Sequence, residues 1–111
     1  MKWTLEEAVA LCRKIEAICP AYGCHVALTG GTLYKHGPRK DCDLLFYRIR
    51  QIPVIFGEDL WVALAEIGFV KNKGYGWCFK ATYEGKPVDC FFPEAYDGAD
   101  ANGEYPEKET V

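Results

Sequence analysis

The sequence lacks any apolar run that approaches the ~18 residues of a membrane-spanning helix. Its opening residues, MKWTLEEAV, place acidic side chains where a secretory signal peptide needs an apolar core. These two absences predict a cytoplasmic protein without membrane contact. Half of the 111 residues are hydrophobic, which excludes a disordered chain and predicts a single folded domain.

The sequence also lacks a CxxC pair, although it has six cysteines. Most of them lie in or beside apolar segments, where a thiol packs as a small hydrophobic group. We therefore expect reduced cysteines, as is usual in the cytoplasm. The grouping of Cys19, Cys24 and His25 is an alternative zinc site, but its spacing is not that of zinc ligands.

Charge is distributed unevenly along the chain, whose net charge is −3. Residues 93–111 contain six acids and one base, so the remainder is slightly basic. We predict a folded domain over residues 1–93 and an acidic, mobile C-terminal tail over residues 94–111. An alternative for this tail is that it covers a basic surface.

Hydrophobic periodicity predicts two main helices, the first from Thr4 to about Cys19 and the second from Glu58 to about Ile67. Thr4 and Glu7 have the spacing of a capping box. Strands are expected at residues 24–29, 42–49, 69–71, 77–83 and 87–92, with one helical turn at residues 32–36. This order predicts an α+β fold, with a mixed sheet of about five strands and the two helices packed on one face.

Two aspartates open the strongest strand candidate, DCDLLF. Because side chains alternate along a strand, Asp41 and Asp43 share one face, with Cα atoms roughly 6.5–7 Å apart. Such carboxylates repel each other, and a divalent cation removes this penalty. Asp89, in KPVDCFF, is a lone acid in an apolar strand and also needs a partner. If the two strands are neighbours, the three acids converge, and ligation by oxygen alone suits Mg²⁺ or Mn²⁺.

A glycine-containing turn precedes the acids and comprises Thr29, Gly30, Gly31 and Thr32. Glycine lets backbone amides approach a phosphate closely, and a short helix starting at Thr32 would direct its free N–H groups there. The two threonine hydroxyls add donors. Cationic side chains on the following connection could offset phosphate charge: Lys35, His36, Arg39 and Lys40.

The stretch LTGGTLYKHGPRKDCDLLF resembles the signature of the DNA polymerase β-like nucleotidyltransferase superfamily. That signature is an apolar residue, Gly and then Gly or Ser, a spacer, and Asp-apolar-Asp opening a strand. The third acid of the family usually lies on a neighbouring strand, as in VDCFF. The likeness runs from Val26 to Phe92 and is strongest to the small stand-alone members of bacteria and their phages.

The resemblance implies a minimal nucleotidyltransferase fold and a metal-dependent enzyme that moves a nucleoside monophosphate from an NTP to an acceptor hydroxyl. Asp41, Asp43 and Asp89 would hold Mg²⁺ or Mn²⁺ and carry the catalysis, with Asp89 receiving the proton. The nucleotide would bind at the glycine turn and at Arg39 and Lys40. The acceptor stays open between an RNA end, a protein side chain and a small molecule.

Departures from the family pattern keep an alternative function open. Lys40 stands where a serine often precedes the acid pair, and Leu45 excludes a register in which Asp43 would be the first acid. The chain also has no room for the helical domain that grips base or acceptor in most active relatives. The alternative is a catalytically silent binding protein, a phage or mobile-element factor acting on a host or partner protein in the host bacterial cytoplasm. A third alternative is that the protein is one half of a pair, in which an oligomer or a partner chain supplies the missing acceptor-gripping part.

Overall fold

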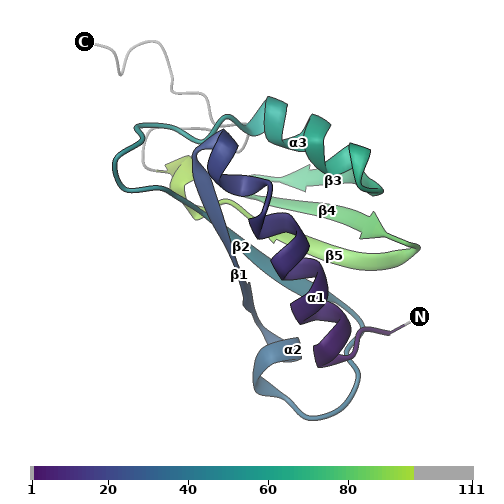
Figure 1. Cartoon of the computed structure of the whole chain (residues 1–111). Coiled ribbons are helices and arrows are strands. Elements are labelled where there is room, and N and C mark those ends of the chain that lie inside the picture. The colour runs from purple at the N-terminus through teal and green to yellow at the C-terminus, as the bar shows by residue number, and fades with distance from the viewer. Residues whose placement is uncertain (1, 97–111) are drawn as a thin grey trace.

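The computed structural model describes residues 2–96. Within this range one five-stranded sheet has the order β1-β2-β5-β4-β3, in which β2 and β5 are parallel and the other neighbours are antiparallel. The elements in chain order are α1 (Leu5–Glu16), the 3₁₀ turn η1 (Cys19–Tyr22), β1 (Cys24–Thr29), α2 (Gly31–Tyr34), β2 (Cys42–Arg48), α3 (Gly57–Glu66), β3 (Phe69–Tyr75), β4 (Cys78–Tyr83), β5 (Lys86–Phe91) and the 3₁₀ turn η2 (Pro93–Tyr96). The two longer helices, α1 and α3, cover the same face of the sheet (Figure 1), which confirms the expected α+β fold.

The capping box of α1 forms as predicted. The Thr4 hydroxyl accepts from the Glu7 amide at 3.1 Å, and the Glu7 carboxylate accepts from the Thr4 amide at 2.9 Å. The helix ends at Glu16 rather than near Cys19. Pro20 explains the difference, because proline has no N–H to donate to the carbonyl of Glu16 four residues earlier, and the chain continues as the 3₁₀ turn η1.

Strand β3 extends to Tyr75, beyond the expected residues 69–71. Its pairing with β4 shifts register between Lys71 and Gly74, so the Asn-Lys-Gly sequence forms an irregularity within the strand rather than a turn. A Cβ on Gly74 would lie 2.8 Å from the ring of Phe79. Glycine is therefore required here because the neighbouring aromatic ring occupies the space.

The core lies between the sheet and the two longer helices. On β2 the side chains of Cys42, Leu44 and Phe46 are fully buried, and Phe46 stacks on Phe92 with ring centroids 4.8 Å apart. The alternate side chains, which include Asp43 and Leu45, are only partly buried. They therefore lie on the face of the sheet that α1 and α3 leave uncovered.

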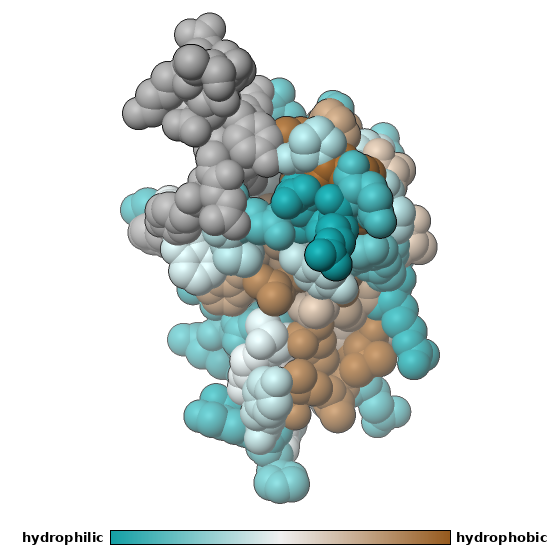
Figure 2. All heavy atoms as spheres, turned by 90° about the vertical axis from the view of Figure 1, so that its left-hand side faces the viewer, coloured by the Kyte–Doolittle hydropathy of each residue, from teal (hydrophilic) through white to brown (hydrophobic). Residues whose placement is uncertain are grey.

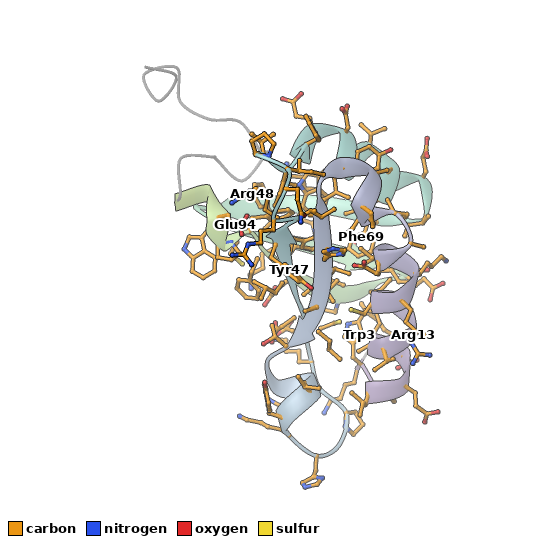
Figure 3. The ribbon with its side chains drawn as sticks, turned by 60° about the vertical axis from the view of Figure 1, so that its left-hand side comes forward. Trp3, Arg13, Tyr47, Arg48, Phe69 and Glu94 are labelled. Carbon is orange, nitrogen blue, oxygen red and sulfur yellow. The ribbon has the colours of Figure 1, made fainter. Side chains whose placement is uncertain are left out.

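The last described residues return to β2. Glu94 of η2 accepts from the Arg48 amide at 3.0 Å and lies 3.4 Å from the Arg48 guanidinium, and Figure 3 shows the two side chains pointing toward each other. Glu94, which we placed at the start of the acidic tail, thus contacts the sheet. The rest of that tail, from residue 97 on, lies outside the described residues.

The cysteines all lie within residues 2–96 and are free, as expected. The alternative zinc grouping is not assembled: the Cys24 thiol donates to the Cys19 carbonyl at 3.7 Å, and His25 pairs with Glu16 at 2.6 Å. No helix in the described part of the chain is long and apolar enough to cross a membrane.

The alternation along β2 can be tested with neighbouring leucines. Leu44→Ala removes a fully buried side chain and should lower the free energy of unfolding by about 2–5 kcal/mol. Leu45→Ala, on the uncovered face, should lower the free energy of unfolding by clearly less. Urea denaturation followed by tryptophan fluorescence measures both, and equal losses would contradict the assignment of the two faces.

Candidate functional site

A row of polar side chains crosses four strands on the uncovered face of the sheet. Thr29 on β1 lies opposite Asp43 on β2, Asp43 lies opposite Asp89 on β5, and Asp89 lies opposite Lys80 on β4. Directly opposed residues of neighbouring strands point to the same face. The structure therefore brings Asp43 and Asp89 together, although they are far apart in the sequence.

The Asp43 and Asp89 carboxyl groups lie beside each other on the β2–β5 pair, close enough for Asp89 to raise the pKa of Asp43. Burial raises the pKa of Asp43 to about 6, and the negative charges of Asp89 and then Asp41 add to this effect. The Gly31 amide donates a hydrogen bond to the Asp43 carboxylate, which lowers the pKa of Asp43 and partly offsets this rise. Asp43 therefore keeps a proton in mildly acidic solution.

Asp89 is buried, with 9% of its surface exposed, and its carboxylate is also paired with Lys80. The Lys80 Nζ atom donates to Asp89 Oδ1 at 2.9 Å, which raises the pKa of this lysine. We did not identify Lys80 from the sequence. A usable signal was present, because the two-residue turn Glu84-Gly85 fixes the register of its hairpin and places residue 80 opposite residue 89.

The glycine turn packs directly against the site. Gly30 has φ 72°, and a Cβ on it would overlap the Asp43 carboxylate. A Cβ on Gly31 would lie 2.9 Å from Arg39 Nε. The glycines thus make room for an aspartate and an arginine, a requirement separate from the phosphate binding expected of them.

The remaining predicted residues surround this turn. Helix α2 begins at Gly31, one residue earlier than expected, and the Thr32 side chain is not among those described. Arg39 is fixed by a pair of backbone hydrogen bonds with Trp3, at 2.7 and 2.8 Å, and its guanidinium lies beside Gly31. Lys40 is exposed, and Asp41 lies half-buried immediately before β2.

The donor set can be compared with the needs of a divalent cation. Asp43 and Asp89 present carboxylate oxygens in contact with each other, and oxygen is the ligand that Mg²⁺ and Mn²⁺ prefer. Within residues 2–96, no three Asp, Glu, His or Cys side chains have their donor atoms gathered for a metal ion. The Asp43–Asp89 pair nevertheless fits a cation, because a bound ion would offset the burial and the charge repulsion that raise the pKa of Asp43.

Comparison with known proteins bears on the fold. No family model and no curated protein matches the sequence. A solved structure described as a cytoplasmic RNA terminal U-transferase is similar, with a TM-score of 0.64 and 14% sequence identity over 83% of this chain. The chain has a minimal nucleotidyltransferase fold. It spans 29% of the length of that structure, so the shared nucleotidyltransferase fold is only part of the larger protein.

The close approach of Gly30 to Asp43 predicts a specific sensitivity. Gly30→Ala should lower the free energy of unfolding by about 1–3 kcal/mol more than Gly37→Ala. Both glycines have positive φ, but a Cβ on Gly37 would meet nothing within 4 Å. Chemical denaturation of both variants measures the difference, and equal costs would show that backbone strain alone matters.

The raised pKa of Asp43 predicts a dependence of stability on pH. The folded protein holds a proton on Asp43 up to about pH 6, whereas the ordinary pKa is 3.8. This contribution to stability is complete below the ordinary pKa and is lost as the pH rises through the folded value. Between about pH 4 and pH 7, metal-free wild type should lose on the order of 1 kcal/mol relative to Asp43→Asn, after allowance for solvent screening.

Unfolding curves recorded with a chelator at several pH values test this expectation. Asp59→Asn, which changes an acid in the first turn of α3, serves as the matched control and should follow wild type. Parallel curves for wild type and Asp43→Asn would count against a proton held on Asp43.

Proposed function

We propose that this protein is a metal-dependent nucleotidyltransferase that transfers a nucleoside monophosphate from an NTP to an acceptor hydroxyl. The observation that supports this most is the pairing of Asp43 with Asp89 beside the double-glycine turn, on the sheet face that α1 and α3 leave uncovered. The likeness in fold to an RNA terminal U-transferase is consistent with it.

In this proposal Asp41, Asp43 and Asp89 hold Mg²⁺ or Mn²⁺, and the residues around the turn bind the triphosphate. A divalent cation bound there would neutralise the charge of the triphosphate oxygens. Gly30, Gly31 and the threonines on either side of them would present backbone and hydroxyl donors. Arg39, held beside the turn, would donate to a phosphate, with Lys40 adding positive charge at the surface.

The proposed reaction is an in-line displacement. The acceptor oxygen forms a bond to the α-phosphorus of the NTP while the bond from this phosphorus to the bridging oxygen breaks, and pyrophosphate leaves. The hydroxyl proton passes to the Asp89 carboxylate. RNA is named in the description of the similar structure, so an RNA end is the first acceptor to test here, before protein side chains and small molecules.

A second candidate is a catalytically silent binding protein, of the kind a phage could direct at a host or partner protein. The ion pair between Lys80 and Asp89 favours it, because the lysine satisfies the acid without a metal. Apolar side chains also gather below the centre of the side seen in Figure 2, bordered by polar ones, which is a surface that a partner chain could contact.

Labelled nucleotides separate the two candidates. The protein is incubated with each labelled NTP, Mg²⁺ or Mn²⁺, and a bacterial extract or RNA, and label transferred to macromolecules is counted. Asp43→Asn and Asp89→Asn should each lower transfer by at least about 100-fold. Asp59→Asn, on α3, should leave it unchanged.

Transfer that persists in both aspartate variants would refute the proposed site. Absence of transfer by wild type with every nucleotide and acceptor would favour the binding protein.

A further inference from the structure

We infer that Lys80 is an exchangeable counter-cation of Asp89: it neutralises this acid in the metal-free protein, is displaced when a divalent cation binds, and then donates to a phosphate of the nucleotide. The inference rests on the proposed function, which it deepens by making cation and nucleotide binding mutually dependent. It assigns a role to a residue outside the set of acids, turn residues and cations named from the sequence.

The two partners of the ion pair differ in exposure. The Asp89 side chain is 12% exposed, whereas that of Lys80 is 48% exposed, and the atoms that pair are 2.9 Å apart. A buried carboxylate without a partner is strongly disfavoured, so the ionised Asp89 needs a positive charge beside it. The lysine can leave at little cost, because its ammonium group would be hydrated at the surface on a flexible stem.

The position of Lys80 is built into the sheet. Glu84 and Gly85 both have positive φ, as a tight two-residue hairpin turn requires, and the antiparallel register that follows pairs Lys80 with Asp89. The parallel register of β2 and β5 then places Asp43 on the other side of Asp89. Asp89 therefore lies between an acid that could share a cation with it and a base that competes for the same carboxylate.

Electrostatics makes the two cations compete. A divalent ion on the Asp43–Asp89 pair and an ammonium group hydrogen-bonded to Asp89 would repel each other over a few ångströms. Binding of the ion alone must therefore displace Lys80 into solvent. When a triphosphate is present, the released ammonium group gains charge-assisted hydrogen bonds to its oxygens. Each ligand should consequently strengthen the binding of the other.

Titration calorimetry with Mn²⁺ on metal-free protein tests the inference without any catalytic readout. In the absence of nucleotide, Lys80→Gln should bind Mn²⁺ roughly 5- to 10-fold more tightly than wild type, because no lysine has to be displaced. With a non-hydrolysable NTP present, this advantage should shrink or reverse. Lys80→Arg, which keeps the charge, should resemble wild type.

Arg13→Gln is the matched control for net charge. Arg13 is an exposed residue of α1, on the helix-covered side of the sheet (Figure 3), and its replacement should leave the affinity for Mn²⁺ unchanged. Lys80→Met keeps the apolar stem and serves if Lys80→Gln folds poorly, as judged by circular dichroism. In chelator, both neutral variants should also have a lower melting temperature than wild type. On addition of Mn²⁺, their melting temperature should rise by more than that of wild type.

The outcomes separate the inference from the proposed function. If wild type and Lys80→Gln bind Mn²⁺ equally, with and without nucleotide, the role of Lys80 is refuted and the nucleotidyltransferase proposal stands. If neither binds Mn²⁺ under any condition, both are refuted. If Lys80→Gln binds Mn²⁺ more tightly but wild type transfers no nucleotide, Lys80 does compete with the cation for Asp89, and only the proposed reaction is refuted.

Discussion

The parallel pairing of β2 with β5 is the constraint on which the site depends. It places Asp43 directly opposite Asp89 and thereby brings together acids from the two halves of the sequence. The alternate side chains of both strands are buried under the helices, so a slip by one residue would drive the acids into the core and core residues into solvent. Apolar burial thus holds side by side two acids that would repel each other when both are ionised.

Signals local in sequence were sufficient for much of the fold. The capping box at Thr4, the limits of β1 and the alternation along β2 all follow from neighbouring residues, and the structure has them as expected. The meeting of Asp43 with Asp89 was also foreseen, conditional on the two strands being neighbours. The family resemblance suggested that β2 and β5 are neighbours, whereas hydrophobic periodicity alone cannot decide which strands pair.

Features that the sequence reasoning missed depend on contacts between distant side chains. The irregularity in β3 exists because the Phe79 ring occupies the space beside Gly74, and no pattern within residues 69–75 announces it. The reason for Gly30 was likewise different from the expected one. A glycine before a helical turn indicates that another group lies close to the backbone, but the sequence does not say that this group is the Asp43 carboxylate. Lys80 carries no local pattern that marks it as a site residue, and only the pairing of β4 with β5 brings it to Asp89.

The segment before α1 is held by contacts with residues synthesised much later. Trp3 pairs with the backbone of Arg39, and its indole N–H donates to the Pro87 carbonyl at 2.7 Å. On the ribosome, the first helix can form early but cannot be fastened in place until β5 has emerged from the exit tunnel. Contacts between residues so distant in sequence slow folding, so the indole of Trp3 reaches its final position only after β5 has joined the sheet.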